Sequence, residues 1–122
     1  MIVGWAQVAP FQEHAFRWTT VNGMQDLGTL GGVYSQARDI NTGGVIVGWA
    51  TISIGLGRAF IWDRFTGMWN LNTLLPANSG WELIEANGIN DKGQVVGWGW
   101  KGGLAHAYLL TPVPPAPPVL KQ

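Results

Sequence analysis

The pentapeptide Ile2-Val3-Gly4-Trp5-Ala6 recurs letter for letter as Ile46-Val47-Gly48-Trp49-Ala50, and in a looser form as Val95-Val96-Gly97-Trp98-Gly99. The spacings are 44 residues (46 minus 2) and 49 residues (95 minus 46), which are typical of a repeat protein whose units pack on one another. The pentapeptide is a continuous run of mostly apolar residues, and this pattern predicts a strand buried on both faces. The glycine in its centre would let a backbone or a ring, such as the Trp49 indole, lie close.

The residues around the pentapeptide repeat as well. Ala15-Phe16-Arg17-Trp18 aligns with Ala59-Phe60-Ile61-Trp62, and the third copy has His106-Ala107-Tyr108 in place of His14-Ala15-Phe16. The second unit carries five extra residues around Pro76-Ala77-Asn78-Ser79-Gly80. Proline, asparagine, serine and glycine favour turns, so we expect a lengthened surface loop at 76–85.

A complete unit is predicted to hold four short strands. In the second unit they lie at 37–41, 45–50, 58–63 and 68–71, with a tight Asn-Thr-Gly-Gly turn at 41–44. Because no helical period persists, the chain is predicted to be all-β, a β-propeller-like array of four-stranded antiparallel blades. A stacked β-solenoid is the rival architecture. The first unit begins at its second strand and the third ends at its third, so the chain holds about two and a half blades. It is then either a fragment of a longer array or one of several copies that assemble so that each covers the next.

The chain divides into a β-repeat domain at 1–111 and a Pro-rich tail at 112–122, which holds five of the seven prolines. The units are expected at about 1–32, 33–75 and 81–111. The tail favours a polyproline II conformation, which suits either a linker or a segment that docks on an adjacent copy.

The composition narrows the range of partners. Charged residues make up only 11% of the chain, and seven basic residues balance seven acidic ones. Nucleic acid and anionic membranes are therefore not expected partners, since both need a concentrated basic face. The chain has no cysteine and no apolar run of the roughly 20 residues that a membrane-spanning helix needs. We do not expect Met1 to begin a signal peptide, so either the protein is cytosolic or a leader has been removed or lay outside this chain. So few charges leave much uncharged surface, which must be covered by glycine, amide and hydroxyl side chains or be buried against other copies.

Several motifs together resemble the HAF repeat, a family of bacterial extracellular repeat proteins named for its His-Ala-Phe motif. They are Gly88-Ile89-Asn90, Val95-Val96-Gly97, His14-Ala15-Phe16, the segment from Gly23 to Gly32, and Ser35 with Ala37. The resemblance implies an exported protein, extracellular or at the cell surface, with a propeller-like build and no generally assigned activity. The second unit departs from the pattern, because it has Arg58 for the histidine and Leu75-Pro76 for the closing glycines.

No set of catalytic or metal-binding groups is evident. His14 and His106 occupy equivalent positions in separate units, whereas a metal site needs three or four converging ligands. Glu82 and Glu85 lie three residues apart in one segment, which is a poor match to the paired carboxylates of a glycosidase. Nucleophile-elbow and phosphate-loop motifs are absent from the sequence. We therefore expect no enzymatic activity, no cofactor and no metal.

The eight tryptophans fall into two groups. Five recur at fixed strand positions and are predicted to pack between blades: Trp5, Trp49, Trp98, Trp18 and Trp62. Three lack counterparts, namely Trp69, Trp81 and Trp100. With Asn78 and Ser79 in the inserted loop, these three are the candidates for a ligand site or a subunit contact.

Two functions of different classes follow. The first is a non-enzymatic structural or interaction module that associates with itself into a ring or a filament, since partial repeat arrays leave their end faces uncovered. The second is a glycan-binding module, in which exposed tryptophan stacks on a sugar beside polar loops.

Overall fold

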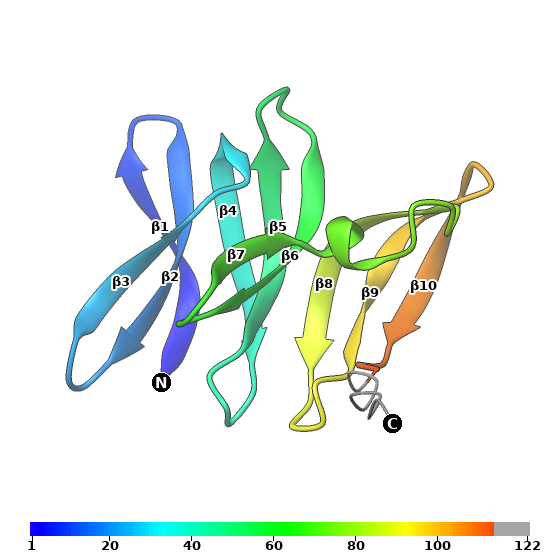
Figure 1. Ribbon diagram of the computed structural model, residues 1–122. Coiled ribbons are helices and arrows are strands. Elements are labelled where there is room, and N and C mark those ends of the chain that lie inside the picture. The colour runs from blue at the N-terminus through cyan, green and yellow to red at the C-terminus, as the bar shows by residue number, and fades with distance from the viewer. Residues whose placement is uncertain (114–122) are drawn as a thin grey trace, which may run out of the picture.

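The computed structural model describes residues 1–113, and within them the chain forms ten strands and one short 3-10 helix, arranged as three groups of strands side by side (Figure 1). The first unit holds β1 (Ile2–Ala9), β2 (Gln12–Thr19) and β3 (Gly23–Gly28). The second holds β4 (Gly31–Ile40), β5 (Ile46–Ile52), β6 (Gly57–Asp63) and β7 (Gly67–Asn70), followed by η1 (Leu71–Leu74). The third holds β8 (Trp81–Ile89), β9 (Val95–Lys101) and β10 (Leu104–Leu110). The prediction of an all-β chain is confirmed.

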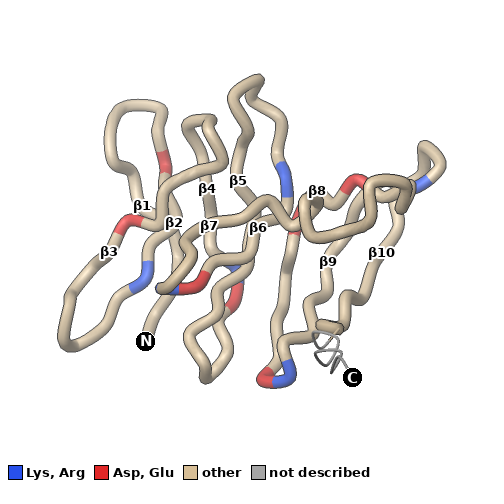
Figure 2. Tube along the Cα trace, viewed as in Figure 1, with Lys and Arg blue, Asp and Glu red and all other residues tan. Residues whose placement is uncertain are grey.

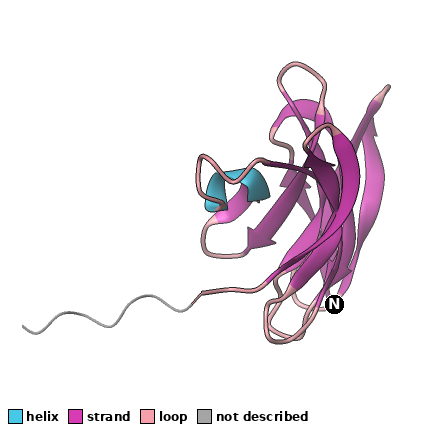
Figure 3. Cartoon of the chain, turned by 90° about the vertical axis from the view of Figure 1, so that its right-hand side faces the viewer, coloured by secondary structure: helices cyan, strands magenta, loops and turns pink. Residues whose placement is uncertain are grey.

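Each unit is an antiparallel meander, and the units form two open sheets. The first and second units share one sheet, because β2 and β4 pair in parallel at Glu13 and Tyr34. The strands β8, β9 and β10 form a separate sheet. Neither sheet closes on itself within residues 1–113. The long strands run roughly alongside one another, and β7 and η1 lie to one side of them (Figure 3).

The hairpin turns form as the Asn-to-Gly pattern predicts. The Asn41 side chain accepts a hydrogen bond from the Val45 amide at 3.0 Å, and Asn90 does the same for Gln94 at 2.9 Å. Each turn ends on a glycine with positive φ, 85° at Gly44, a conformation that side chains with a Cβ rarely adopt. The two turns are therefore copies of one local structure.

The hydrophobic core lies between the units rather than within them. One cluster joins the first and second units and contains Ala15, Leu27, Ala37, Ile46, Ala50, Phe60 and Trp62. The other joins the second and third units and contains Val47, Ala59, Leu71, Leu83, Ala86, Ile89, Val95 and Tyr108. Because successive strand residues point to opposite faces, Ile46 and Val47 place β5 in both clusters, and both are fully buried. The strand is thus buried on both faces, as predicted.

The glycine of the pentapeptide makes room for an aromatic ring on the neighbouring strand. Gly48 pairs with Phe60, and a Cβ at Gly48 would lie 2.9 Å from that ring and collide with the Gln36 carbonyl. Gly4 with Phe16 repeats this arrangement in the first unit. The suggestion that Trp49 supplies the ring is wrong, because the cross-strand partner occupies that space.

The inserted segment is shorter than expected. We predicted a loop over 76–85, whereas β8 already begins at Trp81. Two register shifts, between Leu83 and Glu85 and between Ala86 and Gly88, interrupt the alternation of β8. Because such bulges break the period of two, the sequence pattern hides the first half of this strand. The first strand of the second unit is likewise longer than 37–41, since β4 begins at Gly31.

Charged residues are few and scattered over the trace (Figure 2). Neither sign gathers on one face. No helix in the described part of the chain is long and apolar enough to cross a membrane. The interpretation of the tail as a linker or a docking segment concerns mainly 114–122, which lie outside the described residues.

Candidate interaction surfaces

A shallow depression of about 540 Å³ opens at one end of the third unit. It is lined by Gly80, Trp81, Glu82, Trp100, Gly102 and Gly103. The strands β8 and β9 supply its side chains, and the glycines flank them in the loop before β8 and the β9–β10 turn. The depression brings together two of the three unmatched tryptophans, Trp81 and Trp100.

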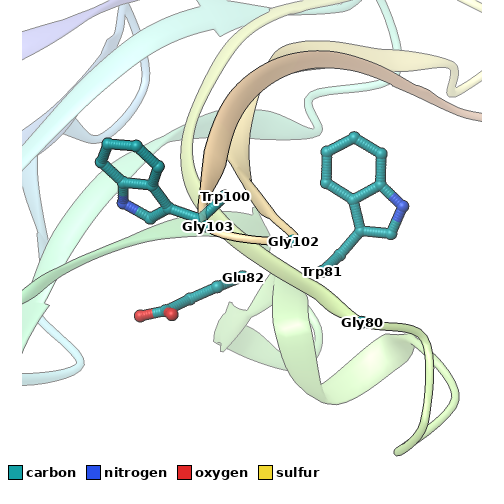
Figure 4. Close-up of a pocket in the computed structure, with 6 residues that line it drawn as sticks. All are labelled: Gly80, Trp81, Glu82, Trp100, Gly102 and Gly103. Carbon is teal, nitrogen blue, oxygen red and sulfur yellow. The ribbon is translucent and has the colours of Figure 1, made fainter.

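The two indoles nevertheless lie on opposite sides of the sheet (Figure 4). Trp81 pairs with Lys101, and the next residue, Glu82, pairs with Trp100, so strand alternation places Glu82 and Trp100 on the same side. The Trp81 ring packs edge-on against His106 and Tyr108, with centroids 6.0 and 6.3 Å apart. It is a packing residue in a strand, and differs in this from the exposed loop tryptophan that we expected.

Trp100 and Glu82 carry the exposed side chains of the depression. Trp100 is 42% exposed and meets the Trp98 ring edge-on at 5.5 Å. The Glu82 carboxylate forms an ion pair with the Arg58 guanidinium of the second unit, with 2.6 Å between oxygen and nitrogen. A carboxylate beside an open indole can accept hydroxyl donors while an apolar ring face stacks on the indole.

The remaining candidates lie elsewhere. Trp69 is exposed on β7, beside a second depression that Ile61, Asp63, Thr66 and Leu74 also line. Asn78 is exposed in the loop before β8, and the Ser79 hydroxyl accepts a hydrogen bond from the Trp81 amide at 3.2 Å. Ser79 therefore shapes the start of β8, and Trp69 does not join the depression at Trp81.

The five recurring tryptophans have unequal surroundings. Trp62 is buried between the first and second units, with the Arg17 guanidinium 4.9 Å from its ring centroid. Trp5 is exposed, although Arg38 of the next unit lies 5.5 Å from its ring. Trp49 and Trp98 are half-buried and donate to side chains on their own sheets, Gln36 and Glu85 respectively. Trp18 is exposed on the outer side of the first unit.

Polar contacts link the turns of the second and third units. The Asp91 carboxylate accepts from the Thr42 amide at 2.9 Å, and the Asn41 side chain donates to the Asn90 carbonyl at 3.2 Å. The Thr42 amide, as the largest contribution, lowers the pKa of Asp91 below its ordinary value. Near the end of β4, the Asp39 carboxylate accepts a hydrogen bond from the Ile89 amide at 2.9 Å. These bonds hold consecutive units in register at one edge.

Glu85 is the centre of a second polar group. Its carboxylate accepts from the Trp98 indole at 2.6 Å and pairs with Arg38 at 3.3 Å, while its backbone carbonyl accepts from the Tyr108 hydroxyl at 2.7 Å. Burial, followed by the charge of Glu85, raises the pKa of Tyr108. Tyr108 therefore stays protonated as a structural donor. The sequence pattern missed this group because the bulges in β8 conceal which side Glu85 faces.

The two histidines do not converge on a common site. His14 pairs with Asp26 at 3.0 Å in the first unit, and His106 packs on Trp81 in the third. In the described residues, no three side chains of His, Asp or Glu gather in a way that could hold a metal ion.

The outer faces of the first and third units are surfaces that residue-by-residue analysis of the sequence missed. We call Ile2, Phe16, Trp18 and Met24 the N-terminal end face, and Val96, Trp98, Ala107 and Leu109 the C-terminal end face. Most of these side chains are exposed, and Phe16 and Trp98 are half-buried. Their equivalents in the second unit are mostly buried, and because the equivalent residues are nearly the same, the repeat itself gives no signal of which copies stay exposed.

The fold and these surfaces define an all-β repeat protein with stacked units and apolar end faces. The chain belongs to the family described as "Protein of unknown function (DUF3466)", whose model matches residues 25–103. Comparison with curated proteins gave no match, and comparison with solved structures gave none either.

Proposed function

We propose that the chain is a non-enzymatic structural module, built of propeller-like blades, that associates with itself. The observation that carries this proposal is the pair of apolar end faces. Inside the chain, unit boundaries are held by buried apolar faces, and the two faces left at the ends have the same kind of residues. Contiguous exposed apolar surface of this kind is typical of an interaction site.

The propeller-like arrangement is the finer part of the proposal. The second unit has four antiparallel strands, β4 to β7, and both of its faces pack on neighbouring units. Radially packed four-stranded sheets are the building principle of a propeller. A closed ring needs four to eight blades, so self-association would bring further blades alongside. The resemblance to the HAF repeat supports the same build, together with an extracellular or cell-surface location.

Sedimentation velocity of the purified chain over a wide concentration range tests self-association. We expect species well above the chain mass of 13.2 kDa, because burying apolar area drives association. Negative-stain images should then show rings or filaments. A chain that remains monomeric at every concentration would refute the proposal.

Glycan binding at the depression is a second candidate, favoured by the open Trp100 ring beside the Glu82 carboxylate. If this is the function, Trp100→Ala should abolish binding on a glycan array. Trp69→Ala removes an equally exposed indole outside the depression and should leave binding intact. Trp81→Ala is a poorer test, because Trp81 packs on His106 and Tyr108. Equal loss in the Trp100 and Trp69 variants would count against a site at this place.

A further inference from the structure

The residues of the N-terminal end face form a row across the first unit. Ile2 pairs with Trp18, and Trp18 pairs with Met24, so all three point to the same side of the sheet. Ile2 is 57% exposed and Met24 62% exposed. The row is apolar, and His14 and Asp26, which line a depression together with Met24, bond to each other at 3.0 Å.

The second unit contains the same row in a covered state. Ile46 pairs with Trp62, and Trp62 pairs with Met68, at the positions equivalent to Ile2, Trp18 and Met24. Ile46 and Trp62 are buried and Met68 packs on them, all in the cluster shared with the first unit. This row is therefore the surface by which a unit packs against the unit before it.

The C-terminal end face corresponds to the other face of the second unit, which packs on the third unit. Val96 pairs with Leu109 and Trp98 pairs with Ala107, while Val96 is 46% and Leu109 61% exposed. The equivalent pair in the second unit, Val47 with Ile61, packs in the cluster shared with the third unit. Ala15 and Ala59, the equivalents of Ala107, are fully buried. This is the surface by which a unit packs against the unit after it.

We propose that the C-terminal end face of one copy packs on the N-terminal end face of the next, so that copies join head to tail. This inference rests on the proposed self-association and specifies its geometry. At both boundaries inside the chain, a valine and an alanine of one unit, Val3 with Ala15 or Val47 with Ala59, pack on the opposite face of the following unit. The C-terminal end face is an uncovered copy of the first kind of surface, and the N-terminal end face is an uncovered copy of the second. Such a heterologous contact makes rings if the rotation closes and filaments if it does not.

Two variants with one blocked face each give the test. Trp18→Glu places a charge on the N-terminal end face, and Leu109→Glu places one on the C-terminal end face. Val21→Glu and Phe65→Glu change apolar residues that are more than 80% exposed in turns and serve as controls. Circular dichroism verifies the fold of each variant, and sedimentation velocity measures its mass.

Head-to-tail packing predicts that each blocked variant alone loses association at least tenfold and runs as a monomer. An equimolar mixture should form a heterodimer, because one free face of each kind remains. The control variants should assemble as the unmodified chain does. If the unmodified chain assembles but a blocked variant still dimerises alone, the contact joins like faces, and this inference fails while self-association stands. A monomeric unmodified chain refutes both.

Discussion

Gly48 shows how one residue type sets the spacing of a whole strand pair. It lies where the Phe60 ring crosses β5, and the Gln36 carbonyl closes the other side. A side chain there would have to displace backbone, which a packed interior resists. The recurrence of glycine in all three pentapeptides therefore reflects packing.

We expect Gly48→Ala to lower the free energy of unfolding by about 3 kcal/mol, because the added methyl group would overpack the core. Gly57→Ala is the matched control, since a Cβ there would lie at an ordinary 3.6 Å from the Trp49 ring. It should change the free energy of unfolding by less than about 1 kcal/mol. Urea denaturation measures both, and equal effects would contradict the packing role of Gly48.

Asp91 gives a prediction that depends on pH. Its pKa is lowered in the folded chain, chiefly by the hydrogen bond from the Thr42 amide. This hydrogen bond therefore stabilises the fold at pH values above the pKa that Asp91 has in the unfolded chain. That contribution is lost as the pH falls below about 4, through the unfolded and then the folded pKa. The Thr42 amide resonance in NMR spectra should shift over this range, and the shift should vanish in Asp91→Asn. An unchanged titration in the variant would show that Thr42 senses another group.

At the scale of elements, the inserted segment illustrates what pattern reading could and could not provide. The repeat comparison predicted the strands β5, β6 and β7 to within a few residues, because their apolar positions recur in register. It failed for the first half of β8, where two bulges shift the alternation. It also placed Trp81 in a loop, although contacts with His106 and Tyr108 hold it in a strand. Those contacts join residues far apart in sequence, so local pattern could not reveal them.

Asn72 fastens η1 to the start of β8. Its side chain accepts from the Leu83 amide at 2.7 Å and donates to the Leu83 carbonyl at 2.9 Å. Because Leu83 is fully buried, Asn72→Ala would leave two backbone groups without partners, and we expect a loss of about 1–3 kcal/mol in unfolding free energy. Asn87→Ala, at an exposed position of the same strand, should be nearly neutral in thermal or urea unfolding. The Leu83 amide should also exchange its hydrogen faster in Asn72→Ala. An unchanged exchange rate would contradict the role of Asn72 in holding Leu83.

At the scale of the whole molecule, the central point is that each unit has two different apolar faces. The sequence predicted a repeat array with incomplete ends, since the first and third copies lack a strand that the second has. It did not predict which faces remain open. Trp62 is buried while its equivalent Trp18 is exposed, and only the order of the packed units explains the difference. Composition alone cannot distinguish these two positions, because their local sequences are nearly the same.

Cross-linking between single cysteines tests the stacking of end faces most directly, since the chain has no cysteine of its own. Met24→Cys marks the N-terminal end face and Leu109→Cys the C-terminal end face. A short bis-maleimide added to the mixed chains should give a product of twice the chain mass that contains one of each. Val21→Cys mixed with Phe65→Cys, both in exposed turns, should give little product. Equal yields from the two mixtures, or products of like chains only, would contradict the account.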